Sequence, residues 1–252
     1  MHRSAIVLAG GRSSRMGQDK ALLPLGGLTL LGAVVRELLA VDRVEDVVVV
    51  GSRVFDPEQA LGSSLPLVED GQMIHFVNDG WPGQGPLGGL ISGLAFLSDW
   101  RSLESDPDTD GANTVALLSC DLPRLTARSV QYLFERLEGP SSTLRSAAME
   151  RDVVTEPMTP GDPGVTVVDV VMSVRMGRVQ PLHSVLRQCV YPSLLRGFLA
   201  GERRLVVALA ELNAATLPDE LGSSEDADTP EDWRRLTGLQ EPGPGGERAL
   251  GG

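Results

Sequence analysis

The segment AIVLAGGRSSRMGQDKALLPLGG, Ala5–Gly27, decides the fold of this 252-residue chain. Its apolar start predicts a buried strand over Ser4–Gly10, and a polar loop with two leading glycines follows. The spacing of leucine and valine then predicts a helix over Leu28–Ala40. A strand that passes through such a loop into a helix is typical of an open α/β sheet, in which ligands bind beyond the carboxyl ends of the strands.

The remainder of the chain continues the alternation of strands and helices. Strands are expected over Val44–Val50, Ile74–Asn78, Thr114–Ser119 and, at a sheet edge, Val165–Val171; helices are expected over Leu90–Leu97, Ala127–Leu137, Pro192–Ala200 and Arg203–Leu209, and from Thr229 onward. This order predicts a mostly parallel sheet covered by helices. We expect a single domain over residues 1–238, with an acidic loop at 98–113, an insertion at 139–169 and a disordered tail at 239–252.

Composition narrows the classes of function. A net charge of −12 disfavours nucleic acid and anionic membranes as partners. No apolar run reaches the roughly 18 residues that cross a bilayer, and the N-terminal apolar stretch is too short for a signal peptide, so a cytoplasmic protein is expected. Cys120 and Cys189 lack the spacing of a disulfide framework or a zinc site.

Lys20 is the sole lysine among 22 lysine and arginine residues. A compact ammonium fits among phosphate oxygens in a way that a planar guanidinium does not, which favours a phosphate-binding role. The alternative is that one lysine escaped an arginine-biased composition. The neighbouring Arg12, Ser13, Ser14 and Arg15 add cations and hydroxyls that match the needs of a triphosphate.

Two familiar nucleotide-binding motifs do not explain this loop. A Walker A sequence is excluded because Gly17 is followed by Gln18-Asp19-Lys20. The pattern GxGxxG occurs at Gly83, Gly85 and Gly88, but it contains Pro86 and follows the third expected strand instead of opening the fold. A dinucleotide-binding site is therefore disfavoured.

Aspartates at two positions are candidate magnesium ligands. Asp121, in Cys120–Pro123, comes directly after the buried strand Thr114–Ser119, at the edge where phosphates are expected. Asp228, just before the last helix, would complete the site. The alternatives are that Asp121 caps a turn and that Asp228 is a turn residue beside the N-cap Thr229.

Five ordered motifs give the chain a specific resemblance. They are LAGGRSSRMGQDKALLPLGG, GPLGGL at Gly85–Leu90, CDLP at Cys120–Pro123, QPLHSV at Gln180–Val185 and DTPEDW at Asp228–Trp233. Together they resemble the motifs of molybdenum cofactor guanylyltransferases, from Ala5 to about Leu236. The resemblance implies a three-layer α/β/α Rossmann-like nucleotidyltransferase fold with a mostly parallel mixed sheet.

The resemblance also implies a reaction and roles for residues. GTP and molybdopterin would be the substrates, Mg²⁺ the cofactor, and GMP transfer with release of pyrophosphate the reaction; protein partners are not implied. Arg15, Lys20 and Asp121 would be catalytic, with Asp121 a metal ligand. The nucleotide would contact Leu8, Ala9, Gly10, Gly11, Lys20, Asp79, Gly88, Gly89 and Asp121, and the acceptor would contact Gln180 and His183, near Arg175 and Arg178.

Departures from the family pattern keep alternatives open. Val50-Gly51-Ser52 stands where these enzymes often carry Asn, and Asp226-Ala227-Asp228 replaces Asn-x-Asn, which resembles the cytidylyltransferase branch. His183 is as readily a structural residue as a ligand. A molybdopterin cytidylyltransferase, a phospholactate or sugar-1-phosphate nucleotidyltransferase, and a nucleotide-binding relative without turnover are therefore the alternatives.

Overall fold

A computed structural model describes residues 2–10, 19–51, 56–62, 65, 68–69, 71–102, 113–139 and 167–238 of the protein. Most of the expected insertion, 140–166, and the expected tail, 239–252, lie outside the described residues. The same is true of 11–18 in the first loop and of 103–112 in the expected acidic loop.

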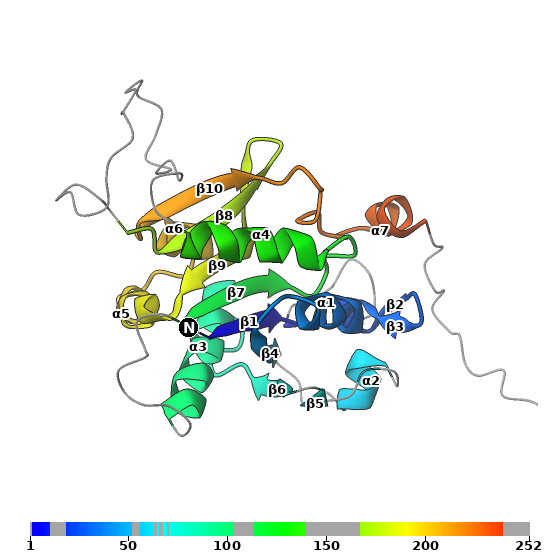
Figure 1. Cartoon of the computed structure of the whole chain (residues 1–252), viewed down its shortest axis with the longest axis horizontal. Coiled ribbons are helices and arrows are strands. Elements are labelled where there is room, and N and C mark those ends of the chain that lie inside the picture. The colour runs from blue at the N-terminus through cyan, green and yellow to red at the C-terminus, as the bar shows by residue number, and fades with distance from the viewer. Residues whose placement is uncertain are drawn as a thin grey trace, which may run out of the picture.

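One mixed sheet forms the centre of the molecule (Figure 1). Within the described residues it has eight strands in the order β10-β8-β9-β7-β1-β4-β6-β5. The strands are β1 (Arg3–Leu8), β4 (Val44–Gly51), β5 (Val68–Glu69), β6 (Gln72–Asn78), β7 (Thr114–Ser119), β8 (Val170–Arg175), β9 (Arg178–Arg187) and β10 (Ala214–Pro218). β5 and β9 pair antiparallel with their neighbours, and the other pairs are parallel, which confirms the mostly parallel mixed sheet.

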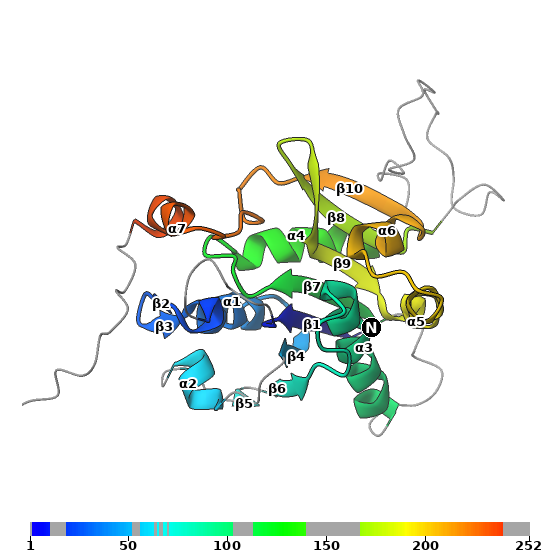
Figure 2. The ribbon, with the colours of Figure 1, turned by 180° about the vertical axis from the view of Figure 1, so that it is seen from behind.

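Helices cover both faces of the sheet. They are α1 (Leu30–Leu39), α2 (Pro57–Leu61), α3 (Pro86–Ser102), α4 (Ala127–Glu138), α5 (Tyr191–Leu199), α6 (Leu205–Ala210) and α7 (Pro230–Thr237), with 3-10 turns at η1 (Lys20–Leu22) and η4 (Gln188–Val190). α1 and α4 pack on one face and α3, α5 and α6 on the other (Figure 2), so the three-layer α/β/α architecture is confirmed. None of the described helices combines the length and hydropathy that a bilayer span requires.

The central strand β1 shows how the sequence divides its side chains between the two layers. Ala5 and Val7 are buried against α1 and α4, whereas Ile6 and Leu8 are buried against α3. Successive strand residues point to opposite faces, and each fully buried Ile, Leu or Val contributes about 1.5–3 kcal/mol. This two-sided burial explains why the first strand is a continuous apolar run.

Helix α3 differs from the prediction at both ends. It begins at Pro86, four residues before the expected start at Leu90, because proline is tolerated in the first turn of a helix. It ends at Ser102, so its last five residues belong to the segment that was expected to be an acidic loop. The glycines Gly88 and Gly89 therefore lie in a helix and not in the preceding turn.

The predictions for the second half of the sheet were incomplete. The edge strand expected over Val165–Val171 begins later, at Val170, and runs to Arg175 as β8. The expected edge position is wrong, because β10 pairs with β8 on the side away from β9. Strands β9 and β10 were not expected at all. In β9 the register with β8 shifts, so that Ser173 pairs with Gln180 while Met172 pairs with Ser184. The intervening residues, Pro181 among them, form a bulge, which accommodates a proline that has no N–H to donate.

The last helix, α7, packs at the same end of the molecule as the short hairpin of β2 (Pro24–Leu25) and β3 (Leu28–Thr29) (Figure 1). Thr229 is the expected N-cap, and it forms a capping box with Asp232 at the start of the helix. Trp233 is fully buried against Leu23 and Leu30, which anchors the helix beside η1. This packing brings the segment before α7 to the carboxyl ends of the central strands.

Candidate active site

Lys20 occupies the first position of η1, after the loop that follows β1. The carboxylate of Asp19 caps this turn by accepting a hydrogen bond from the backbone N–H of Ala21 at 3.2 Å. The Lys20 ammonium lies 2.6 Å from Asp228 Oδ1 and 3.3 Å from Asp121 Oδ2. Three of the predicted site residues, far apart in the sequence, are thus in direct contact.

Asp121 is held at the end of β7 from two sides. The hydroxyl of Ser119 donates to Asp121 Oδ1 at 2.5 Å, which orients the carboxylate. The backbone carbonyl of Asp121 accepts a hydrogen bond from the N–H of Ala227 at 3.0 Å. Because Ala227 stands between Asp226 and Asp228, this single bond fixes the segment before α7 against the end of β7.

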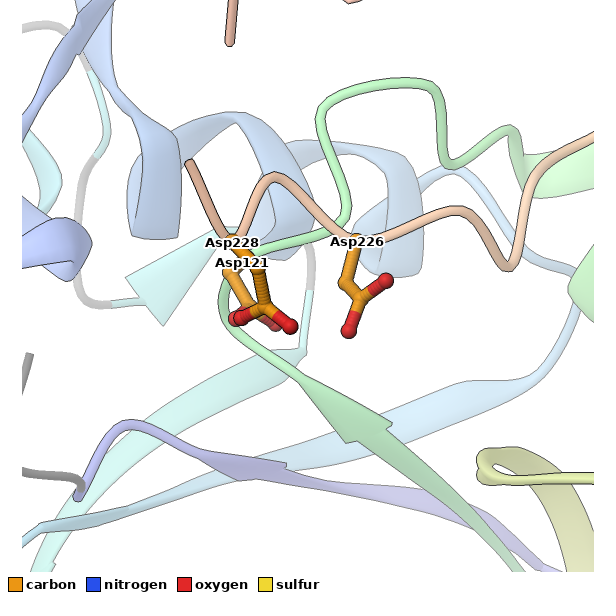
Figure 3. A group of neighbouring side chains, drawn as sticks. All are labelled: Asp121, Asp226 and Asp228. Carbon is orange, nitrogen blue, oxygen red and sulfur yellow. The ribbon is translucent and has the colours of Figure 1, made fainter. Parts of the chain in front are cut away.

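Asp121, Asp226 and Asp228 form an acidic cluster in which one oxygen of each lies within 4.8 Å of the others. Figure 3 shows their carboxylates pointing in the same direction, Asp121 from the turn after β7 and the other two from the segment before α7. Oxygen ligands of this kind suit a hard divalent cation such as Mg²⁺. The donor set therefore fits the cation that the sequence predicts.

Asp226 was not among the predicted metal ligands, although its sequence context carries a signal. Exposure alternates along this segment, with Asp226 and Asp228 exposed. Ala227 is buried, so Asp226 and Asp228 on either side of it both face the site. The spacing Asp-x-Asp next to a helix N-cap was the available clue.

The charges in this cluster are mutually dependent. Partial burial lowers the pKa of Lys20, but the hydrogen bond that Lys20 donates to Asp228 and the charge of Asp121 outweigh it, so the net shift is upward and Lys20 stays protonated. Burial and the negative charges of Asp228 and Asp121 raise the pKa of Asp226. One ammonium thus leaves part of the repulsion among three carboxylates uncompensated, an arrangement that favours a further cation.

Cys120 lies beside Asp121 but has no reactive character. Its side chain is buried, and burial together with the charge of Asp121 raises the pKa of its thiol well above the ordinary value. The thiolate is the nucleophilic form of cysteine, and here it is disfavoured. The site therefore offers no cysteine nucleophile.

The residues predicted to contact the nucleotide surround the ends of β1 and β6. Leu8 and Ala9 are buried, and Gly10 is exposed. A Cβ atom on Gly89 would lie 3.0 Å from Leu8 Cδ2, so glycine allows the first turn of α3 to approach the end of β1. Gly88 serves the same purpose toward Trp81, whose Cβ would lie 3.0 Å away. Gly89 thus brings α3 close to the end of β1, and Gly88 brings it close to the turn after β6.

Asp79 stabilises the turn between β6 and α3. Its Oδ1 atom accepts hydrogen bonds from the backbone N–H of Trp81 at 2.9 Å and from the hydroxyl of Ser92 at 3.1 Å. The Ser92 hydroxyl in turn accepts from the N–H of Gly80. Contact of Asp79 with the nucleotide remains a prediction.

The two residues predicted to bind the acceptor have different surroundings. Gln180 is partly exposed, and its amide donates to the carbonyl of Arg178 at 3.4 Å. His183 is 2% exposed, with Nδ1 2.5 Å from the hydroxyl of Ser173 and Nε2 3.3 Å from that of Ser129. Burial lowers the pKa of His183 to about 4, so its ring is neutral and built into the interior. This placement favours the structural alternative for His183.

Two predicted site residues, Gly11 and Arg15, lie outside the described residues, as do Arg12, Ser13 and Ser14. Arg175, expected near the acceptor, is paired with Glu225 instead of facing an open surface. The structure thus brings together Lys20, Asp121 and Asp228, and adds Asp226.

Residues 5–215 match the family model of the MobA-like NTP transferase domain. The chain belongs to this family. The match begins within β1 and ends within β10. The acidic segment before α7 lies beyond it.

Individual relatives agree with this assignment. The probable molybdenum cofactor guanylyltransferase of Carboxydothermus hydrogenoformans is 26% identical over 243 residues, covering 91% of this chain and 92% of that protein. The crystal structure of molybdopterin-guanine dinucleotide biosynthesis protein A from Archaeoglobus fulgidus superposes with a TM-score of 0.60 at 20% identity, covering 93% and 97% of the two chains.

A second solved structure shows that the fold alone does not determine which nucleotide base is used. The 4-diphosphocytidyl-2C-methyl-D-erythritol synthase of Anaerococcus prevotii also superposes with a TM-score of 0.60, at 13% identity over 94% of this chain and 95% of that one. The MobA-like architecture is therefore shared by an enzyme named for a cytidyl product. The choice of base depends on residues at the site and not on the fold.

Proposed function

We propose that this chain transfers GMP from GTP to the terminal phosphate of molybdopterin. An oxygen of that phosphate attacks the α-phosphorus of GTP, the bond from the α-phosphorus to the bridging oxygen breaks, and pyrophosphate leaves. The single observation that carries the proposal is the contact of the sole lysine with Asp121 and Asp228, in a chain whose residues 5–215 match the MobA-like domain. The relative from Carboxydothermus hydrogenoformans is similar over 91% of this chain and is named a probable molybdenum cofactor guanylyltransferase, which supports guanine as the base and the molybdenum cofactor as the acceptor.

Lys20 would neutralise charge on the triphosphate as the α-phosphorus is attacked. Its neighbours keep it protonated, so it remains an ammonium at neutral pH. Both substrates are anions and the chain carries a net charge of −12, so a local cation is needed to hold them together. Arg15, in the loop after β1, would be a second such cation.

The carboxylates of Asp121, Asp226 and Asp228 would hold Mg²⁺. When bound, the ion would supply charge neutralisation at the nucleotide phosphates. Ser119 keeps the Asp121 carboxylate oriented, and the bond from Ala227 keeps the other two acids beside it. No protein nucleophile is required, because the attacking oxygen belongs to the acceptor and the buried Cys120 thiol stays neutral.

The proposal is tested by incubating the purified chain anaerobically with molybdopterin, Mg²⁺ and each nucleoside triphosphate, and separating the products by chromatography. GTP should give the guanine dinucleotide and one pyrophosphate per product. Asp121→Ala should lower the rate by at least about 10²-fold while retaining nucleotide binding. The exposed Asp42 is a control, since Asp42→Ala should keep the wild-type rate. Product from CTP alone, or an unchanged rate in Asp121→Ala, would contradict the proposal.

A further inference from the structure

Glu225 joins two arginines that belong to different parts of the fold. One carboxylate oxygen, Oε2, is paired with Arg175 at the end of β8, and the other, Oε1, lies 2.5 Å from Arg235 on α7. The Glu225 side chain is only 15% exposed, so its carboxylate is largely shielded from water, whereas Arg235 is half exposed. Glu225 is also the residue immediately before the acidic segment.

The network continues into the cap of α7. Arg235 Nη2 lies 2.9 Å from Asp232 Oδ1, and the other oxygen of Asp232 accepts hydrogen bonds from the backbone and the hydroxyl of Thr229. Arg235 therefore connects Glu225 to the capping box of Thr229 and Asp232 at the start of the helix.

These contacts reveal an alternation along residues 225–229. Glu225, Ala227 and Thr229 hold the segment in place, through the arginine pairs, the bond to Asp121 and the helix cap respectively. The two residues between them, Asp226 and Asp228, carry the carboxylates of the acidic cluster. Exposure alternates in the same way, with Asp226 and Asp228 exposed and Ala227 buried, so anchoring the odd positions directs the even ones toward the site.

We propose that Glu225, held by Arg175 and Arg235, is a positioning residue for the divalent-cation site. It fixes the start of the segment, so that Asp226 and Asp228 reach Asp121 at the distances that a shared cation needs. The inference rests on the proposed function in one respect, namely that the three carboxylates bind a divalent cation.

A simple charge effect predicts the opposite sign. Removing the positive charge of Arg175 or Arg235 near an acidic cluster would strengthen the binding of a cation by electrostatics alone. Loss of positioning would weaken it, because Glu225 would no longer hold the segment. Substitution of either arginine therefore separates the two explanations by direction and not only by magnitude.

The experiment measures Mn²⁺ binding to the full chain by electron paramagnetic resonance of the free ion, at about 0.15 M salt. Arg175→Gln and Arg235→Gln should each weaken binding by roughly tenfold, as supporting residues around metal ligands typically do. Asp226→Asn sets the scale for the loss of one ligand. Arg234→Gln is the matched control, since Arg234 is on the same helix and pairs with Glu231 instead of Glu225.

The outcomes are distinct. Arg234→Gln should bind Mn²⁺ within about twofold of the wild type, because an exposed charge is screened by salt. Equal or tighter binding in Arg235→Gln, which changes a half-exposed residue and leaves the core intact, would overturn the positioning role. A wild-type chain that binds no Mn²⁺ would overturn the cation site itself, and the positioning role with it.

Discussion

Acidification should expose the structural role of His183 as a loss of stability. The ring is 2% exposed and lies between the hydroxyls of Ser129 and Ser173, and burial lowers its pKa from 6.5 to about 4 in spite of the nearby charge of Asp219. The unfolded chain therefore binds more protons than the folded chain between these two pH values. Stability is fully present above pH 6.5 and falls as the pH approaches 4.

The size of the effect follows from the shift. One pKa unit corresponds to about 1.4 kcal/mol, so the wild type should lose about 2 kcal/mol of unfolding free energy by pH 5 and about 3 kcal/mol by pH 4 through this residue. His183→Asn lacks the titrating ring but keeps a polar side chain between the two serines. It should be less stable than the wild type at pH 7.5, and the difference should shrink as the pH falls.

The assay is urea unfolding followed by tryptophan fluorescence at a series of pH values for both proteins. Because every other titrating group is common to the two chains, the difference between the curves isolates His183 and its interaction with Asp219. Parallel curves from pH 7.5 to pH 4.5 would refute the reasoning. If His183 instead binds the acceptor, His183→Asn should raise KM for molybdopterin and leave the pH dependence unchanged.

Two further predictions concern Lys20 in the site and the packing of glycines in helices α3 and α5. Lys20→Arg should lower kcat by about 10²-fold, because a planar guanidinium cannot take the place of an ammonium 2.6 Å from Asp228, and a wild-type kcat in that variant would remove the special role of the lysine. Gly93→Ala in α3 would place a Cβ 2.8 Å from Ile6 Cδ1 and should cost about 1–3 kcal/mol in urea unfolding, less a helix-propensity gain of up to about 1 kcal/mol. Gly197→Ala in α5, with no atom within 4 Å, should instead stabilise by about 0.5–1 kcal/mol, and equal effects in the two variants would contradict the packing argument.

The sequence predicted best the strands whose residues are almost all apolar. Strands β1, β4 and β7 are continuous apolar runs bounded by turns, and they were placed within one or two residues. β9 was missed because RVQPLHSVLR mixes polar residues and a proline into a strand whose bulge accommodates them. The start of α3 was missed because Gly88 and Gly89 lower helix propensity, while close packing on Leu8 and Trp81 requires them.

The residues of the candidate site likewise fall into those that the sequence could predict and those that it could not. Lys20, Asp121 and Asp228 could be chosen because each follows a strand or precedes a helix whose position the sequence predicts, and all three are in contact. Asp226 required knowledge that Ala227 is buried between two exposed aspartates. The environment of His183 depends on serines from β8 and α4, a juxtaposition that no local pattern encodes.

The most direct test of guanine selectivity is a thermal-shift titration of the chain with GTP, CTP, ATP and UTP, each with and without Mg²⁺. At a GTP concentration about 100 times its dissociation constant, binding contributes about 2.7 kcal/mol, which should raise Tm by roughly 5–10 °C. We expect this shift for GTP, enhanced by Mg²⁺, and much smaller shifts for the other three nucleotides. A larger shift with CTP, or no shift with any nucleotide, would contradict the assignment as a guanylyltransferase.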